Sequence, residues 1–118
     1  MRDFRKYSIW DLAHKLTLKV YSLTEDFPKS EVFGLRSQIR RAVASIPTNI
    51  SEGCGRESDD EFRRFLIIAS GSASETLYLM ILCKDLGFIT EDEFNNCETE
   101  LTIIRKSIHQ LIKKLKIS

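Results

Sequence analysis

The chain has 118 residues, of which 42% are hydrophobic and 30% charged, and its formal net charge is +1. This length suffices for one hydrophobic core, so we expect a single domain over residues 1–118. The near-neutral charge excludes a global attraction to nucleic acid or membranes, so any basic binding surface must be local. Five Gly and two Pro are too few turn residues for an all-β fold.

The sequence predicts neither a membrane span nor a secretory signal. Charged residues interrupt nearly every apolar window before it reaches about 18 residues, and no apolar block follows the charged N-terminus. Cys54, Cys83 and Cys97 are odd in number and widely spaced, which indicates no disulfide framework or metal knuckle. We therefore expect three buried, reduced cysteines in a cytoplasmic protein that has no membrane partner.

The first helix is predicted over residues 9–26. Its apolar residues recur at steps of three and four, which places on one face Ile9, Leu12, Leu16, Val20 and Leu23. Ser8 is the expected N-cap, and Pro28 marks the end of the helix. Residues 1–7 form an arm with two aromatic side chains that can pack back onto the body.

The second helix begins near residues 33–35 and continues to about Glu52. Pro47 lies inside it, and proline lacks an N–H donor and crowds the carbonyl of Val43, so we expect a kink there. Gly53 and Gly55 are expected to end the helix, because glycine adopts a left-handed cap conformation without steric cost.

The third helix is predicted at about residues 59–86, with a capping box of Ser58 and Glu61 at its start and Gly87 as its C-cap. Its apolar residues are too widely distributed for a single face, which predicts burial both within the domain and against a neighbour. The small residues 70–74 would let another backbone approach closely.

The fourth helix follows a capping box of Thr90 and Glu93. Apolar residues then keep a regular 3-4 spacing from Phe94 to Leu115, which is typical of a packing seam. Four helices joined by short connections predict an all-α, up-down-up-down four-helix bundle with a proline-kinked second helix.

Four stretches carry a resemblance to a known family: FRK with a following W and A, GLRSQIRRAVASIPTNISEGCGR, EFRRFLIIASGSASE and KDLGFIT. Over essentially the whole chain they resemble the four-helix-bundle proteins encoded in intervening sequences of bacterial 23S ribosomal RNA genes. The resemblance implies a ring-like homopentamer. That family is similar to the accessory protein of diversity-generating retroelements, whose basic pentameric barrel binds nucleic acid and a reverse transcriptase. The net charge of +1 departs from such a strongly basic protein.

No enzymatic centre is predicted. The Glu-x-x-His pairs of di-iron bundles are missing, because neither His14 nor His109 has a glutamate three residues before it. The chain also has no G-x-S-x-G elbow, P-loop or dinucleotide fingerprint. We therefore expect a non-enzymatic protein without a metal or other cofactor.

Three polar residues near the proline have two interpretations. Asn49, Glu52 and Glu75 could form a partly buried ligand site that faces inward. Alternatively they are structural and bond the main-chain groups freed by Pro47, because buried polar groups require partners. We favour the structural interpretation.

Six arginines are the candidate nucleic-acid-binding residues: Arg36, Arg40, Arg41, Arg56, Arg63 and Arg64. In a single chain they could simply form a solvated face paired with Asp59, Asp60 and Glu61. A closed ring would repeat each cluster around its axis, and the summed field could attract phosphate. Two hypotheses stay open: an oligomer that binds RNA or DNA, and a structural scaffold that docks a protein partner.

Overall fold

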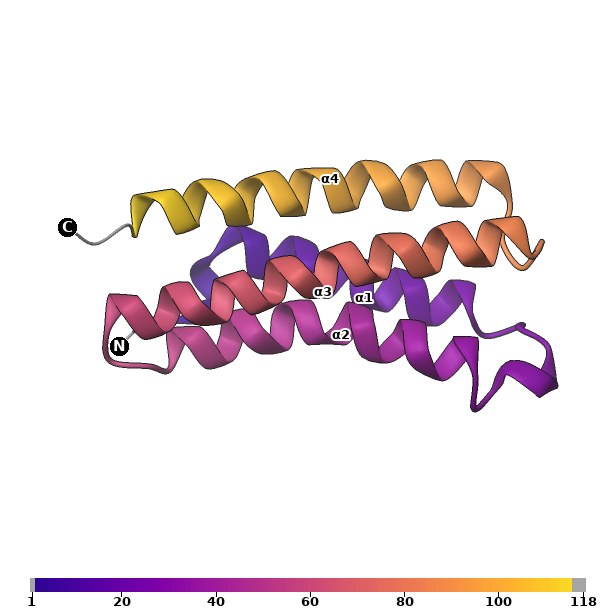
Figure 1. The fold of residues 1–118 in the computed structure, drawn as a ribbon, viewed down its shortest axis with the longest axis horizontal. Helices are drawn as coiled ribbons and strands as arrows, with labels where there is room; N and C mark the ends of the chain where they lie inside the picture. The colour runs from indigo at the N-terminus through magenta and orange to yellow at the C-terminus, as the bar shows by residue number, and fades with distance from the viewer. Residues whose placement is uncertain (1, 116–118) are drawn as a thin grey trace.

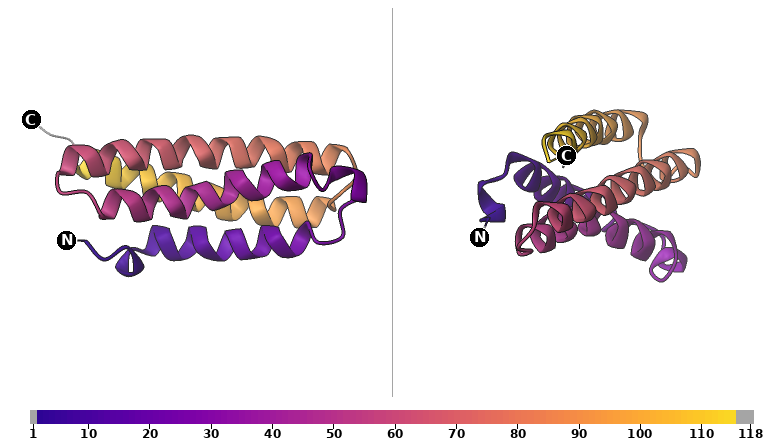
Figure 2. Two further views of the ribbon diagram at one scale, coloured as in Figure 1. Left: turned by 90° about the horizontal axis from the view of Figure 1, so that it is seen from below. Right: turned by 60° about the vertical axis from the view of Figure 1, so that its left-hand side comes forward.

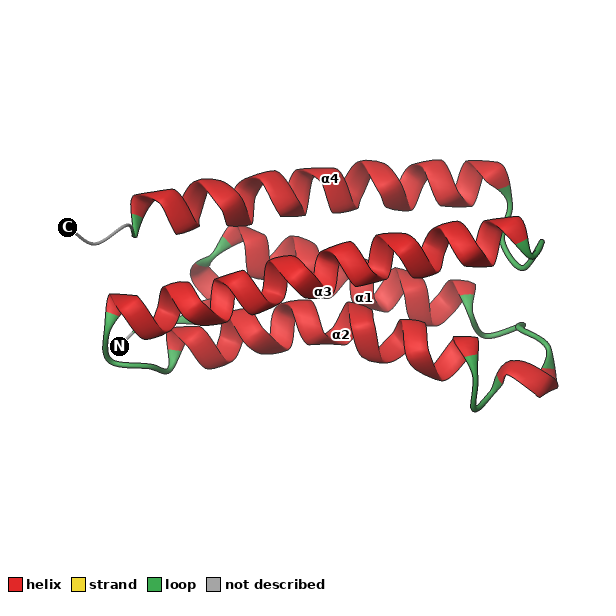
Figure 3. Cartoon of the chain, viewed as in Figure 1, coloured by secondary structure: helices red, strands yellow, loops and turns green. Residues whose placement is uncertain are grey.

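The computed structural model describes residues 2–115, and within this range all regular structure is helical (Figure 3). The four long helices are α1 (Ser8–Leu23), α2 (Leu35–Cys54), α3 (Asp59–Asp85) and α4 (Glu91–Lys114). Two short 3-10 helices, η1 (Phe4–Lys6) and η2 (Lys29–Glu31), precede α1 and α2. Successive long helices run in opposite directions (Figure 1), which confirms the predicted all-α, up-down-up-down bundle.

The bundle is an elongated body of 48 × 23 × 21 Å. Each long helix packs against its neighbours in chain order, and α4 returns to contact α1 (Figure 2). The most extensive contacts join α2 to α3. Because the number of helices is even, α1 begins and α4 ends at the same end of the bundle (Figure 1).

The ends of α3 and α4 follow the predicted caps closely. The Thr90 hydroxyl accepts a hydrogen bond from the Glu93 amide at 3.1 Å, and the Glu93 carboxylate accepts from the Thr90 amide at 2.9 Å. Ser58 accepts from the Glu61 amide at 3.1 Å, although the return bond of a full box is not formed there. Gly87 has φ +79° and follows α3 in a Schellman motif, with its amide bonded to the Lys84 carbonyl.

Two expected caps differ from the structure. Tyr7, rather than Ser8, is the N-cap of α1; it directly follows η1 and makes no side-chain cap hydrogen bond. Gly53 lies inside α2, and Gly55 caps it with φ −80°, so neither glycine is left-handed. Close packing against α3 favours glycine at position 53, because a Cβ there would lie 2.9 Å from both Phe62 Cδ1 and Phe65 Cβ.

The core is a continuous cluster of apolar side chains from all four helices, with Phe62 fully buried near the start of α3. The N-terminal arm packs back onto it as expected. The Tyr7 ring meets the Phe62 ring edge-on at 5.7 Å between centroids, and the Arg2 guanidinium lies over the same Phe62 ring, 4.4 Å from its centroid. Arg2 also pairs with Asp59, so the arm is joined to the first turn of α3.

The expectation that charged residues interrupt the apolar windows does not hold for α3. This helix contains an 18-residue window with mean hydropathy 1.6, which makes it long and apolar enough to cross a membrane by length and composition only. In the bundle, 33% of that window is buried. The reason is that α3 combines an inner apolar face with an outer one, and the small residues between them add little polarity.

Pro47 stays within α2, and the kink expected there stays a prediction. The main-chain group that the proline deprives of its donor is the carbonyl of Val43. The Thr17 hydroxyl of α1 lies 3.3 Å from this oxygen and donates to it as well as to the Ala13 carbonyl. The compensation that we expected from Asn49 or Glu52 therefore comes from the neighbouring helix.

Candidate nucleic-acid interface

Arg40 is held against the end of α1. Its Nε donates to the Thr24 hydroxyl at 2.8 Å, one Nη donates to the Tyr21 carbonyl at 2.9 Å, and the guanidinium lies 4.5 Å from the centre of the Tyr21 ring. A cation at the C-terminal end of a helix also stabilises the negative end of its dipole. Arg40 thus caps α1 and fastens it to α2, and few of its donors are left for a phosphate.

Arg36 shares a counter-ion with Arg40. The Glu25 carboxylate lies 3.7 Å from Arg36 and 3.3 Å from Arg40, and the side chains of these arginines are 22% and 18% exposed. Exposed ion pairs contribute little stability, but this carboxylate lowers the local positive potential. Two of the six predicted arginines are therefore partly neutralised.

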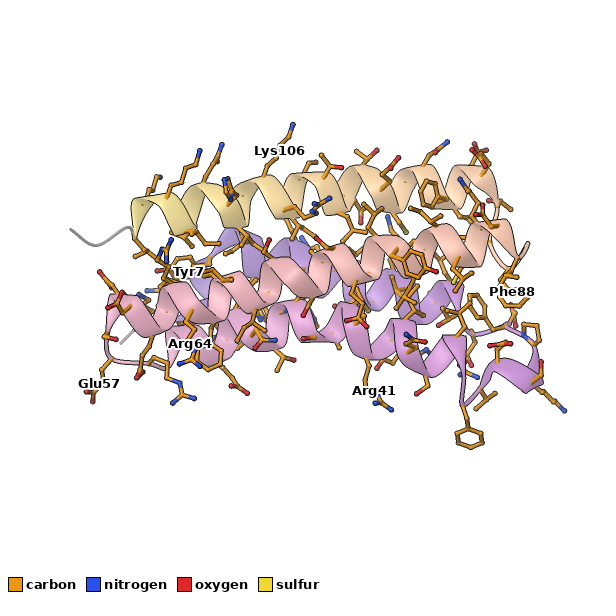
Figure 4. All side chains as sticks on the ribbon, viewed as in Figure 1. Tyr7, Arg41, Glu57, Arg64, Phe88 and Lys106 are labelled. Atoms are coloured by element: carbon orange, nitrogen blue, oxygen red, sulfur yellow. The ribbon has the colours of Figure 1, made fainter. Side chains whose placement is uncertain are left out.

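Arg41 lies on the same helix but faces solvent. It points away from α2 (Figure 4), and among residues 2–115 no carboxylate lies within ion-pair distance of it. Two shallow grooves adjoin it, of about 550 Å³ and about 610 Å³. The first contains Phe33, which is 97% exposed.

The other three arginines lie near the opposite end of α2. Arg56 lies over the Phe65 ring at 4.9 Å, Arg64 is exposed on α3, and the buried Nε of Arg63 has no partner within the described residues. Arg56 follows the end of α2, and at a rise of 1.5 Å per residue it is roughly 20 Å from Arg41 along the axis of this helix. The structure thus brings the arginines together as two groups, Arg36–Arg41 and Arg56–Arg64, rather than as one.

The three polar residues near Pro47 do not converge. Asn49 donates to the carbonyl and the hydroxyl of Ser45 at 2.8 Å and 2.9 Å, and the Ser45 hydroxyl lies 2.8 Å from that of Ser72 on α3. Glu52 and Glu75 are exposed, contrary to the inward orientation that we expected. Asn49 therefore takes part in a polar bridge between α2 and α3, which the carboxylates do not join.

A line of exposed residues runs along the outside of α3 with alternating steps of three and four. We call it the outer stripe of α3, and it consists of Arg64, Ile67, Gly71, Ser74, Tyr78, Ile81 and Asp85. Ile67 is 47% exposed and Tyr78 is 60% exposed. No atom lies within 4 Å of a Cβ built at Gly71, so packing inside the bundle does not require glycine there. The outer stripe of α3 therefore leaves three large apolar side chains uncovered, those of Ile67, Tyr78 and Ile81, while burial of α3 against a neighbour stays a prediction.

The three cysteines are buried free thiols, as expected. Burial raises the pKa of Cys83 and of Cys97 to about 11, and it also raises the pKa of Cys54. Neutral, enclosed thiols are poor nucleophiles and poor metal ligands. Within residues 2–115 no group of three or more His, Cys, Asp or Glu side chains is arranged to hold a metal ion.

Sequence reasoning missed the basic half of α4. Arg105, Lys106, Lys113 and Lys114 follow an acidic first half of the helix. The signal that could have found them is the separation of charge along one helix.

Residues 5–110 match the family described as 23S rRNA-intervening sequence protein. The chain belongs to this family. A similar solved structure is the crystal structure of a protein of unknown function from the S23 ribosomal protein family of Bacteroides thetaiotaomicron, with a TM-score of 0.80 and 26% sequence identity. The similarity covers 89% of this chain and 98% of that one. No curated protein matches the chain. The family membership and the bundle fold agree with the resemblance seen in the motifs.

Proposed function

We propose that this member of the 23S rRNA-intervening sequence family is a non-enzymatic, cytoplasmic homopentamer that binds RNA or DNA through its basic surface. The observation that carries the proposal is the outer stripe of α3. Its exposed Ile67, Tyr78 and Ile81 offer an apolar surface to a second copy, and Gly71 allows the two backbones to approach closely.

Assembly would supply the electrostatic field that one chain lacks. With a net charge of +1, a single chain attracts polynucleotides weakly. Arg41 and Arg64 are both exposed, and Arg41 points away from the bundle in Figure 4. A ring repeats each of them at every protomer, and contacts with several phosphates release counter-ions and favour binding.

Two measurements test the proposal. Light scattering at micromolar concentration should give the mass of five chains, and a monomer would contradict the assembly. Fluorescence anisotropy with a labelled generic RNA and a labelled DNA duplex should show sequence-tolerant binding that weakens steeply with salt. An intact oligomer that binds neither probe at low salt would overturn the nucleic-acid role.

A second candidate function is a scaffold that docks a protein, and Phe33 is the observation that favours it. This side chain is 97% exposed next to a groove of about 550 Å³, and an exposed aromatic ring is a frequent anchor in protein interfaces. Co-purification from the native bacterium, with and without nuclease treatment, distinguishes the two functions. A protein partner that persists after nuclease treatment and is lost in Phe33→Ser supports the scaffold.

A further inference from the structure

The charges of α4 are divided between its two halves. Residues 91–100 contain five carboxylates and no cation, whereas residues 101–114 contain four cations and no carboxylate. The cations of the second half are Arg105, Lys106, Lys113 and Lys114. A single helix therefore presents one acidic segment and one basic segment to solvent.

Helix stability explains only part of this division. Cations in the last turn stabilise the negative end of the helix dipole, which accounts for Lys113 and Lys114. Arg105 and Lys106 lie more than two turns before the end of α4, where the dipole has little effect. Within the described residues none of the four cations forms an ion pair, in contrast to Arg36 and Arg40, which share Glu25.

The basic segment borders a groove of about 460 Å³ between α3 and α4. Lys106 and Lys113 are seven residues apart on one face of the helix, which places them about 10 Å apart along its axis. Lys106 points away from the bundle on the side opposite Arg41 (Figure 4). The groove is lined by donor side chains that include Ser70, Thr102, Arg105, Lys106, His109 and Lys113.

We propose that this α3–α4 groove binds the phosphodiester backbone of a polynucleotide and is the main contact of the nucleic-acid binding proposed above, on which the inference rests. Lys, Arg, Ser and Thr side chains are common donors to phosphate oxygens. The acidic segment of α4 repels phosphates, so the strand is confined to the half of the helix after Glu100. Contacts of this kind position a strand without reading its sequence.

The test compares two double variants with the same change in charge. Lys106→Gln with Lys113→Gln removes two cations from the groove, and Lys15→Gln with Lys29→Gln removes two exposed lysines elsewhere. Binding of a labelled single-stranded RNA and of a DNA strand of the same sequence is measured by anisotropy between ~50 and ~200 mM salt. Circular dichroism and light scattering confirm that each variant keeps its helices and its mass.

The groove variant should lose at least about tenfold in affinity at the low salt concentration, and its salt slope should become shallower by about 1.4 for each contacting protomer. The control should stay within about twofold of the unmodified protein. Lys106→Arg with Lys113→Arg should retain binding, because arginine keeps the charge.

Two results would overturn the inference in distinguishable ways. If the unmodified protein binds the strands and the groove variant binds equally well, the groove is not the contact, while nucleic-acid binding as such is upheld. Loss of binding in Arg41→Gln with Arg64→Gln would then assign it to the arginines. If the unmodified protein binds neither RNA nor DNA, both the groove and the proposed function fail.

Discussion

The Thr17 hydroxyl of α1 lies 3.3 Å from the Val43 carbonyl oxygen of α2, the acceptor that Pro47 leaves without its main-chain donor. The same hydroxyl also lies 2.8 Å from the Ala13 carbonyl, so one proton is shared between two acceptors. Pro47 is buried, and water therefore has little access to the freed group. A defect within one helix is thus compensated by the helix packed against it.

Thr17→Val should destabilise the protein by about 1–2 kcal/mol, because a buried carbonyl loses its donor while the side-chain shape is kept. In a Pro47→Ala background the main-chain amide of the introduced alanine can donate to Val43, so the same substitution should cost about 1 kcal/mol less. Urea denaturation of the four proteins measures both values. Equal costs in the two backgrounds would show that Thr17 does not serve the proline.

Arg40→Gln should destabilise by about 1–3 kcal/mol, because hydrogen bonds from a charged group to Thr24 and Tyr21 are lost at the end of α1. Arg41→Gln is the matched control on the next residue, which is exposed, and it should change stability by less than about 0.5 kcal/mol. Thermal or urea denaturation distinguishes them. A neutral Arg40→Gln would mean that the contact contributes nothing to stability.

Gly53→Ala should destabilise by about 1–3 kcal/mol, because its Cβ would overlap Phe62 and Phe65 in a tightly packed region. Gly55→Ala is the control two residues later. Its backbone is already right-handed, and a Cβ there would lie 3.4 Å from the Glu52 carbonyl oxygen, so the change should be close to neutral. Denaturation curves in which both variants lose the same stability would contradict the packing role of Gly53.

Gly71→Leu should have opposite effects on the protomer and on the assembly. Leucine favours a helix by up to about 1 kcal/mol over glycine, and the site is open within the protomer. The larger side chain should block a second copy at the outer stripe of α3 and yield smaller particles in light scattering. Thr99→Leu on the exposed side of α4 is the control and should leave the mass unchanged. A Gly71→Leu protein of full mass would place the interface elsewhere.

Stability should fall as the pH rises from about 9 to about 11 through ionisation of the cysteines. Burial holds the folded pKa of Cys83 and of Cys97 at about 11 against a usual 9.0, so above pH 9 ionisation favours the unfolded chain. Each thiol should account for about 2 kcal/mol at the upper end of this range. Cys97→Ala removes one contribution, and its urea midpoint should fall less steeply with pH. Parallel pH profiles would rule out the thiol.

The bundle could be predicted from the sequence because its determinants are local. Thr90 with Glu93 begins α4, Gly87 ends α3, and the 3-4 spacing of apolar residues identifies the buried faces. The role of Thr17 could not be predicted, because it depends on which residue of α1 lies beside Val43. The arginines were grouped by their proximity in sequence, whereas helix length separates Arg41 from Arg56 and tertiary contacts engage Arg40.

The even number of helices gives the protomer two unlike poles. The first residues of α1 and the last residues of α4 lie at one pole, and the connection that carries Phe33 lies at the other (Figure 1). Any domain joined ahead of α1 or behind α4 would leave the bundle from the first pole. If copies assemble side by side in the same orientation, such fusions would all project from one rim, and the rim with Phe33 would stay open for contacts.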